Sequence, residues 1–402
     1  MKKVYHTAII GGGAAGLMTA VDLLRGKNRL LGDDIVILER LDRVGKKLIS
    51  TGNGQGNLVN RNFSEEFYYG EKDFVKEFIK NEREIDIEKY LSEFGIPLCY
   101  SDEGKGYPLS KQASSVLDII RNFLMKNGVE ERTSFQVTEI ISRANLFEIS
   151  SNSGKVLAEN VVVAVGGAAA KQFGTDGTSY KLLTDLGHKL TKIYPSLVQL
   201  KTDLTVIRGL KGLKEVAKVT AIKGGKEIRS VVGDLLFTEF GVSGSAIFAL
   251  SASIVDKENM TLRVEFIPSM DKTEIEQILN DRAKKDYFNE GDLLVGLINK
   301  RVGQAVIKTA KNNTPEELAK ALKNFTLKVT GNLGFNYAQV TKGGIVTDDV
   351  DKNTMESKLY KNLYIVGEVL DVDGDCGGYN LTFAFTSAIL AARAIKERKR
   401  GN

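Results

Sequence analysis

The segment YHTAIIGGGAAGLMTAVDLL, residues 5–24, constrains the fold of this 402-residue chain more than any other. Its first six residues predict a short strand, and the apolar spacing after the glycines predicts a helix. Gly11, Gly13 and Gly16 fit the pattern G-x-G-x-x-G between them. There the first glycine permits a sharp turn, the second lets the backbone approach a pyrophosphate, and the third lets the helix pack on its strand. The segment therefore predicts a dinucleotide site, with phosphates held by the free N–H groups at the helix start.

A second apolar run, residues 35–38, predicts another strand, and this strand ends in Glu39. The separation of Glu39 from Gly16 is close to the ~20 residues expected of a dinucleotide-binding unit. A carboxylate at this position accepts hydrogen bonds from ribose hydroxyls. An acid there favours an adenosine ribose without a 2′-phosphate, as in FAD or NAD.

The next segment, residues 45–60, reads GKKLISTGNGQGNLVN and is rich in glycine and asparagine. A loop of this composition can wrap around a long cofactor and place amide groups along it. We expect Lys46 and Lys47 to reach phosphate, and Asn53 and Asn57 to bond a flavin edge or a substrate. A flexible surface loop is the alternative, since glycine and asparagine also make plain turns.

Two later apolar runs predict buried parallel strands that also end in glycine. Residues 161–165 are followed by Gly166 and Gly167, and residues 363–366 are followed by Gly367. Ligands of open α/β sheets bind at the carboxyl ends of the strands. Three such ends, far apart in the sequence, favour one extended cofactor that contacts all of them.

The middle of the chain has a different pattern and predicts an inserted domain at 192–335. Short alternating runs predict antiparallel strands over 192–270, and helical spacing predicts a helical part over 271–335. The flanking segments, 1–191 and 336–402, then form one discontinuous cofactor-binding domain.

The inserted domain is expected to shape a substrate pocket beside the cofactor. Asp271 and Thr314 are the predicted N-caps of its helices. The segment FTEFGVSGSAIFALS, residues 237–251, is a candidate for reaching the pocket, and Tyr107 is a candidate for lining it. For both, ordinary packing inside the core is the alternative.

Composition excludes several classes of site. The net charge is only +5, with 56 basic and 51 acidic residues spread along the chain, which argues against nucleic acid as a partner. The one dense basic run, residues 396–400, is expected to be a solvated helix end whose positive charges interact favourably with the helix dipole. Cys99 and Cys376 stand far apart, which excludes a disulfide framework, a zinc site and a dithiol centre. Two histidines are too few for a histidine-rich site, so no metal is expected.

We expect a cytoplasmic protein without a membrane span. Lysines and apolar residues begin the chain as in a signal peptide, but three consecutive glycines interrupt the apolar part. No other segment approaches the ~20 apolar residues that span a bilayer. The oligomeric state is left open.

The chain resembles the flavoproteins with two dinucleotide-binding domains. Within them it closely resembles the bacterial family that includes aminoacetone oxidase and a dehydro-bile-acid reductase. The segments that carry the resemblance are IIGGGAAGL, GKKLISTGNGQGN, GYPLSKQASSV, VVVAVGGAA, GTDGTSYKLLTDLGHKL, PSLVQL, LLFTEFGVSGSAIFALS, VTKGGIV and TMESKLYKNLYIVGEVLDVDGDCGGYNLTFAF. The resemblance implies an α/β, Rossmann-like FAD-binding domain of the glutathione-reductase type, with an inserted β-rich and helical domain. Because no histidine stands in a suitable motif for a covalent flavin link, we expect the FAD to be non-covalent.

The resemblance also implies that the last strand and helix close over the flavin ring. Gly377 and Gly378 would let the backbone approach the ring, and Tyr379 would start the helix. The residues implied to bind the cofactor are Gly11, Gly13, Ala14, Ala15, Gly16, Glu39, Arg40, Lys46, Lys47, Asn53, Gly54, Asn57, Val137, Gly166, Gly167, Gly367, Glu368, Asp371, Gly378, Tyr379, Asn380 and Leu381. Of these, Glu368 and Asp371 are expected near the ribityl chain or as caps of backbone N–H groups.

The favoured function is an FAD-dependent oxidoreductase that acts on a small organic molecule. One form is an NADH- or NADPH-dependent reductase of conjugated C=C bonds, which we favour, and the other is an oxidase of an amine or amino-ketone that uses O2. The alternatives are a flavoprotein that modifies RNA and a non-catalytic flavin sensor. The sequence does not identify the catalytic residues. Tyr107, Tyr379 and Glu239 are the candidates for a proton donor.

Overall fold

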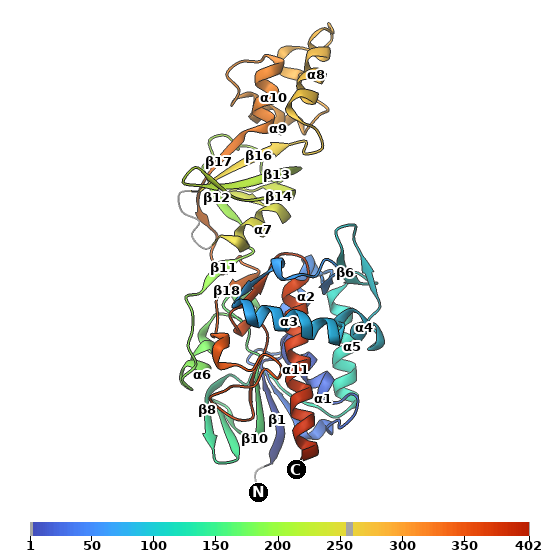
Figure 1. The fold of residues 1–402 in the computed structure, drawn as a ribbon, viewed down its shortest axis with the longest axis vertical. Coiled ribbons are helices and arrows are strands. Elements are labelled where there is room, and N and C mark those ends of the chain that lie inside the picture. The colour runs from blue at the N-terminus through green and yellow to red at the C-terminus, as the bar shows by residue number, and fades with distance from the viewer. Residues whose placement is uncertain (1–2, 255–259, 402) are drawn as a thin grey trace. The chain divides into compact units, whose positions relative to one another are not determined.

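The computed structural model of the protein describes residues 3–254 and 260–401. The chain forms two compact units (Figure 1). Unit 1 comprises Met1–Pro195 and Val340–Asn402, and unit 2 comprises Ser196–Gln339. Each unit has a hydrophobic core of its own. Unit 1 is therefore assembled from two segments that are separated by the whole of unit 2.

Unit 1 is built on a seven-stranded sheet with the order β7-β2-β1-β10-β9-β8, in which β19 also pairs with β10. Its strands are β1 (Val4–Ile10), β2 (Ile35–Leu38), β7 (Glu130–Arg132), β8 (Val137–Arg143), β9 (Leu146–Ser151), β10 (Gly154–Val163) and β19 (Leu363–Ile365). The pairings among β7, β2, β1, β10 and β19 are parallel, whereas β8 and β9 form an antiparallel extension. The Rossmann-like fold class predicted from the sequence is confirmed.

The register of the parallel strands brings their carboxyl ends to one edge of the sheet. Ile10, the last residue of β1, is aligned with Leu38 of β2 and with Val163 of β10. Val163 is in turn aligned with Ile365 of β19. The strand ends that the sequence marks with glycine are therefore neighbours, as predicted.

Helices cover the sheet of unit 1 (Figure 1). They are α1 (Ala14–Leu23), α2 (Lys46–Ile49), α3 (Lys72–Ile85), α4 (Ile87–Glu93), α5 (Ala113–Lys126), α6 (Lys181–Thr184) and α11 (Tyr379–Gly401). The first and last helices, α1 and α11, lie side by side. The start of α11 at Tyr379 agrees with the sequence prediction.

Three smaller sheets complete unit 1, with the orders β3-β6-β5, β20-β4 and β11-β18. Their strands are β3 (Val59–Asn60), β4 (Tyr68–Gly70), β5 (Leu98–Tyr100), β6 (Lys105–Pro108), β11 (Tyr194–Ser196), β18 (Val340–Lys342) and β20 (Val372–Gly374). The two pairs β3-β6 and β4-β20 bring residues around 60 and 70 next to segments that are distant in the sequence.

One expectation about α11 is wrong. The basic run 396–400 was expected to be solvated, but Lys396 is buried, with 6% of its surface exposed. Its ammonium group donates to the carboxylate of Asp22 at 2.8 Å and to the carbonyl oxygens of Asp22 and Arg25 at 2.6 and 3.0 Å. Because α1 ends beside the last turns of α11, this lysine satisfies the carbonyl groups at the α1 terminus.

Unit 2 contains a closed, six-stranded antiparallel barrel with the order β12-β15-β14-β13-β16-β17. Its strands are β12 (Leu200–Thr202), β13 (Lys214–Lys223), β14 (Lys226–Phe237), β15 (Gly241–Ser243), β16 (Met260–Phe266) and β17 (Phe325–Asn332). Its helices are α7 (Ser245–Ser253), α8 (Lys272–Ala283), α9 (Lys300–Ile307) and α10 (Pro315–Lys323).

The boundary between strands and helices in unit 2 differs from the expected one. The segment 325–332 was placed in the helical part, but it forms β17, which closes the barrel. Its buried and exposed residues alternate, which is the pattern of a strand with one face on a core. Asp271 caps α8 in a full capping box, whereas the Thr314 side chain makes no capping bond to α10.

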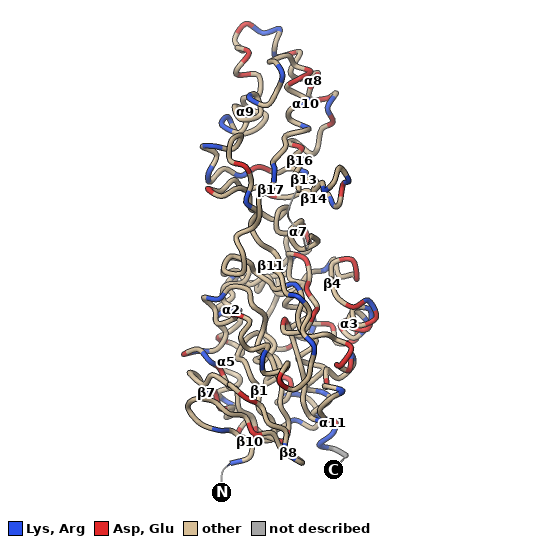
Figure 2. Tube along the Cα trace, turned by 90° about the vertical axis from the view of Figure 1, so that its left-hand side faces the viewer, with Lys and Arg blue, Asp and Glu red and all other residues tan. Residues whose placement is uncertain are grey.

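Acidic and basic residues are interleaved along the trace of each unit (Figure 2). Within the described ranges, no helix is both long enough and apolar enough to cross a bilayer.

Candidate functional site

The turn after β1 is shaped by its glycines. Gly11 has a φ of +106°, and a Cβ there would lie 2.8 Å from the carbonyl carbon of Ala164, at the end of β10. A Cβ on Gly16 would collide with the carbonyl group of Gly11. A Cβ on Gly13, the N-cap of α1, would have no neighbouring atom within 4 Å. The first and third glycines thus serve close packing, and the second leaves the start of α1 accessible, which suits an approaching pyrophosphate.

The carboxylate of Glu39 is held against this turn. Its Oε2 accepts the N–H of Gly12 at 2.8 Å, and its Oε1 accepts the N–H of Leu41 at 2.8 Å. Each oxygen keeps a further lone pair, because an ionised carboxylate offers about four acceptor sites. The backbone carbonyl of Glu39 accepts the N–H of Phe135, which places Val137 two residues further on, at the start of β8.

Arg40, the next residue, is engaged by a partner that the sequence analysis missed. Its guanidinium donates to both carboxylate oxygens of Asp176, at 3.0 and 2.9 Å. The pKa of Asp176 is held well below its usual range by Arg40, and hydrogen bonds from Thr178 add to the effect. The only sequence signal for Asp176 is its place in the motif GTDGTSY. The ion pair joins the end of β2 to the segment that follows β10.

The ends of β10 and β19 meet around Glu368. This carboxylate accepts the ammonium of Lys47 at 2.7 Å and the N–H of Thr341 at 3.0 Å. A Cβ on Gly167 would lie 3.0 Å from Glu368 Oε1, so this glycine admits the carboxylate. A Cβ on Gly367 would lie 2.9 Å from that of Ala15, the second residue of α1. Glu368 therefore caps a backbone N–H group, which is one of the two expected roles.

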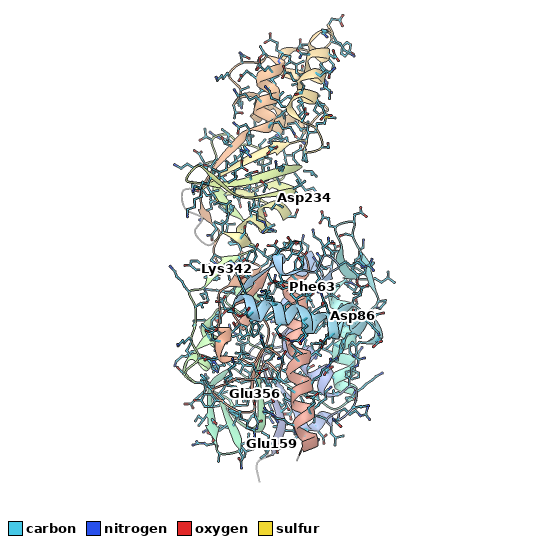
Figure 3. The ribbon with its side chains drawn as sticks, viewed as in Figure 1. Phe63, Asp86, Glu159, Asp234, Lys342 and Glu356 are labelled. Atoms are coloured by element: carbon cyan, nitrogen blue, oxygen red, sulfur yellow. The ribbon has the colours of Figure 1, made fainter. Side chains whose placement is uncertain are left out.

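Thr341 and Lys342 on β18 support these strand ends, and their only sequence signal is their place in the segment VTKGGIV. The Thr341 hydroxyl accepts the N–H groups of Ala168 and Ala169 at 2.7 and 3.0 Å. Lys342, labelled in Figure 3, pairs with the buried Asp373 at 2.9 Å. The other lysine expected at phosphate, Lys46, pairs with Asp42 at 2.5 Å.

The loop at 51–57 combines an exposed turn with a buried amide. Gly52 and Asn53 have φ values of 56° and 55°, and both are exposed, as is Gly54. The Asn57 Oδ1 atom is buried, and in the described part of the chain it has no hydrogen-bond partner. A buried acceptor without a donor is costly, so a ligand that carries an N–H group or hydroxyl would satisfy it.

The side chains at the start of α11 are largely used within the protein. The Tyr379 ring stacks on Phe67 with centroids 4.8 Å apart, and its hydroxyl donates to the Asn62 carbonyl at 3.0 Å. The Asn380 side chain closes the preceding turn through Gly374, at 2.9 and 2.8 Å. Leu381 is partly buried against the core.

The glycines before α11 serve packing in this structure. A Cβ on Gly378 would lie 2.5 Å from the carbonyl carbon of Val59 on β3. This contact supplies a second reason for the glycine, beside the close approach to a flavin expected from the sequence.

Tyr180, in the segment after β10, lies within the electrostatic influence of two acids that follow β19, Glu368 and Asp371. Burial raises the pKa of Asp371, and a hydrogen bond with Thr191 opposes the shift. The Tyr180 hydroxyl is buried without a partner among the described residues. Burial raises its pKa, with a further contribution from the charges of Glu368 and Asp371. Tyr180 was missed by the sequence analysis, although it too belongs to GTDGTSY.

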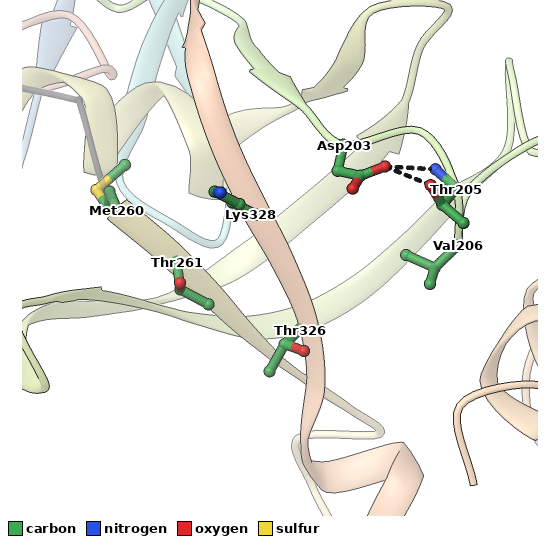
Figure 4. Close-up of a pocket in the computed structure, with 7 residues that line it drawn as sticks. All are labelled: Asp203, Thr205, Val206, Met260, Thr261, Thr326 and Lys328. Atoms are coloured by element: carbon green, nitrogen blue, oxygen red, sulfur yellow. Dashed lines mark hydrogen bonds between the residues drawn. The ribbon is translucent and has the colours of Figure 1, made fainter.

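Two polar pockets lie outside this edge of the sheet. One pocket in unit 2, of about 370 Å³, is lined by residues that include three threonines and Lys328 (Figure 4). Its Asp203 carboxylate is already bonded to the N–H and hydroxyl of Thr205, at 2.8 and 2.6 Å. The other, of about 640 Å³, surrounds Asp22 and Lys396 in unit 1. Neither contains a residue predicted to bind the cofactor.

Comparison with known proteins gives a match over almost the whole chain. The family model described as HI0933-like protein Rossmann domain matches residues 5–394. The 3-dehydro-bile acid delta(4,6)-reductase of Clostridium scindens is 33% identical, over 97% of this chain and 98% of its own. The ribosomal RNA dihydrouridine synthase of Haemophilus influenzae is 26% identical, over 99% of this chain and 100% of its own.

Among solved structures, the 3-ketosteroid-delta4-(5alpha)-dehydrogenase of Rhodococcus jostii has a similar fold. The TM-score is 0.52 with 14% identity, and the match covers 98% of both chains.

Proposed function

This chain belongs to the HI0933-like Rossmann flavoprotein family and is a flavin-dependent oxidoreductase, and we propose that it reduces a C=C bond conjugated with a carbonyl group in a small organic substrate. In this proposal FAD is bound non-covalently, and NADH or NADPH is the transient electron donor. The observation that carries the assignment of FAD is the set of parallel strand ends that meet at the Gly11 turn, with Glu39 fixed beside that turn.

The residues present fit FAD. The start of α1 is accessible to a pyrophosphate, and the carboxylate of Glu39 keeps free lone pairs for ribose hydroxyls. The buried Asn57 Oδ1 offers an acceptor to an N–H group of the flavin ring. Bound FAD supplies the hydride chemistry, while the protein orients it and tunes its surroundings.

The names of two relatives support the reaction class. A delta(4,6)-reductase of a 3-dehydro-bile acid acts on double bonds conjugated with a 3-oxo group. Dihydrouridine is uridine whose ring double bond, also conjugated with a carbonyl, has been reduced. Both names therefore describe the addition of hydrogen across an activated C=C bond. The higher identity to the bile-acid reductase favours a small, largely apolar substrate.

The experiment that tests this proposal follows the flavin band of the purified protein under anaerobic conditions. We expect NADH or NADPH to bleach the band and a 3-oxo-4-ene steroid, as a model conjugated ketone, to restore it. A flavin that neither nucleotide bleaches, but that an amino-ketone does, would overturn the reductase in favour of the oxidase. A colourless protein that takes up no added FAD would overturn both.

A second candidate, reduction of uridine in RNA, is favoured by the full-length match to the ribosomal RNA enzyme. The interleaved charges of both units speak against a concentrated phosphate-binding surface (Figure 2). The same assay separates the two candidates. If ribosomal RNA restores the band in moderate salt and acquires dihydrouridine, while conjugated ketones do nothing, the RNA substrate is correct.

A further inference from the structure

We propose that Tyr107 is the catalytic proton donor of this reaction and delivers a proton to the substrate carbon next to the carbonyl group. The inference rests on the proposed function and adds a residue for its second half, the transfer of hydrogen to the C=C bond.

Tyr107 lies between two segments that are predicted to hold the reactive end of FAD. It belongs to β6, whose Gly106 pairs with Val59 of β3, and Val59 in turn packs against Gly378. The Cε1 atom of Tyr107 is 3.5 Å from the position of a Cβ on Gly52, in the loop 51–57. The strand β6 is thus close to both this loop and the start of α11.

The alternation of side chains along β6 places the Tyr107 side chain on the face of the strand toward the start of α11. Successive side chains of a strand point to opposite faces, so Lys105 and Tyr107 share one face. The Cε atom of Lys105 is 3.7 Å from the position of a Cβ on Gly377, which identifies this face as the one toward α11. A Cβ on Gly106 would instead meet the Tyr100 ring at 2.9 Å, on the other face.

The two other candidate donors are engaged elsewhere. The hydroxyl of Tyr379 already donates its proton to the Asn62 carbonyl. Glu239 pairs with Lys211 at 2.7 Å, and its side chain is 54% exposed. In contrast, the half-buried Tyr107 has no hydrogen-bond partner for its hydroxyl among the residues that the structure describes. Its proton is therefore available to a ligand.

The surroundings keep Tyr107 in the protonated form that a donor needs. Burial raises the pKa of the phenol, and the positive charge of Lys105 opposes this shift. The neighbouring Cys376, Glu103 and Cys99 add to the rise. The net pKa is above the usual value of 10.0, so the hydroxyl is neutral throughout the physiological range.

The reduction adds a hydride and a proton to the two carbons of the C=C bond. The carbon distant from the carbonyl receives a hydride, with its two electrons, and the π electrons move onto the carbonyl as an enolate. The carbon next to the carbonyl then takes the proton of the Tyr107 hydroxyl, so that one C=C π bond is replaced by two C–H bonds. A ketone enolate is a stronger base than a phenolate, which makes this transfer favourable. The phenolate recovers a proton from water, and the electron pair comes from NADH or NADPH, which leaves oxidised.

The test compares the two half-reactions in Tyr107→Phe. We expect reduction of the flavin by NADPH to stay within about twofold of the wild type. Reoxidation by the conjugated ketone should slow ~10²–10⁴-fold, the usual contribution of a positioned acid. The KM for the ketone should change little. Tyr100→Phe, which removes a hydroxyl from the adjacent strand β5, is the matched control and should reoxidise normally.

Three further readouts separate a proton donor from a packing residue. The wild type should show a normal solvent deuterium isotope effect on reoxidation and keep its rate up to about pH 10, because the donor loses its proton only above its raised pKa. Titration of tyrosinate absorbance without substrate should lose one late-titrating group in Tyr107→Phe. Unchanged FAD content would show that the variant folds.

The outcomes distinguish the two proposals. Reoxidation of Tyr107→Phe at the wild-type rate, or the absence of a solvent isotope effect in the wild type, would overturn the role of Tyr107 alone. A wild-type flavin that NADPH reduces but no conjugated ketone reoxidises would overturn the proposed function, and the donor with it.

Discussion

Single charged residues at the candidate cofactor site each do more than one task. Glu39 fixes the turn through the N–H groups of Gly12 and Leu41, and keeps acceptor capacity toward a ribose. Lys47 and Glu368 neutralise each other at 2.7 Å where two strand ends meet. Such pairing limits the cost of placing charge in a partly buried site, because each group has an oppositely charged or hydrogen-bonded partner. We therefore expect a substitution at one of these residues to act on both the local backbone and the binding of the cofactor.

For Glu39→Ala we expect the Kd for FAD to rise about 10–100-fold, which corresponds to the loss of charge-assisted hydrogen bonds. The protein without FAD should also lose about 1–2 kcal/mol of unfolding free energy, because two backbone N–H groups lose their acceptor. Fluorescence titration with FAD and chemical denaturation measure the two effects.

Glu159→Gln is the matched control for Glu39→Ala. Glu159 is exposed on β10 of the same sheet (Figure 3), and its substitution should leave both quantities unchanged. If the Glu39→Ala variant binds FAD with the wild-type Kd, Glu39 does not contact the cofactor.

At the scale of elements, α1 and α11 are joined by a buried polar contact as well as by packing. Asp22 and Lys396 are 4% and 6% exposed. The Tyr90 hydroxyl also donates a hydrogen bond to the Asp22 carboxylate, at 3.0 Å. Further along α11, Arg398 pairs with Glu356, labelled in Figure 3. Since α11 begins at the candidate flavin site and α1 begins at the candidate pyrophosphate site, these contacts would hold two parts of one site in register.

We expect Lys396→Met to lower the free energy of unfolding by about 3–5 kcal/mol, because it leaves a buried carboxylate without its counter-charge. The double variant Asp22→Leu with Lys396→Met should recover part of that loss, since no uncompensated charge remains. Urea denaturation of the four proteins in this cycle measures the coupling.

Lys399→Met is the control, because Lys399 is exposed on the same helix and its substitution should change stability by at most about 0.5 kcal/mol. Equal losses of stability in the Lys396→Met and Lys399→Met variants would mean that the buried pair contributes nothing.

At the scale of the whole molecule, the described residues form two hydrophobic cores of different construction. The core of unit 1 lies around a largely parallel sheet and its helices, and that of unit 2 fills a closed antiparallel barrel. Every residue predicted to bind the cofactor belongs to unit 1. FAD should therefore stabilise unit 1 directly, since a ligand stabilises the folded part that binds it.

Calorimetry of the whole protein tests this division. We expect two unfolding transitions, of which only one rises in temperature when FAD is added. Leu262→Ala, in the barrel core, should cost about 2–5 kcal/mol and lower the other transition alone. A single transition that responds both to FAD and to Leu262→Ala would contradict independent unfolding of the two units.

Local sequence patterns predicted the elements of the cofactor site. Gly11 and Gly16 follow from backbone geometry within one turn, and the apolar run at 35–38 coincides with β2. The alignment of the ends of β1, β10 and β19 was predicted from their shared pattern of an apolar run followed by glycine. Each of these turns and strands depends on residues within about one element of each other, where periodicity and turn chemistry are decisive, and the shared pattern then predicts which strand ends meet.

Only the tertiary structure decided the contacts between distant segments. The pairing of Arg40 with Asp176, the burial of Lys396 against Asp22, and the barrel-closing strand at 325–332 join residues that no local pattern connects. The position of Tyr107 beside the loop 51–57 is of the same kind. Whether a charged or hydroxyl side chain is solvated, paired or available depends on which segments the fold packs against it, and this sets its desolvation cost and its chemistry.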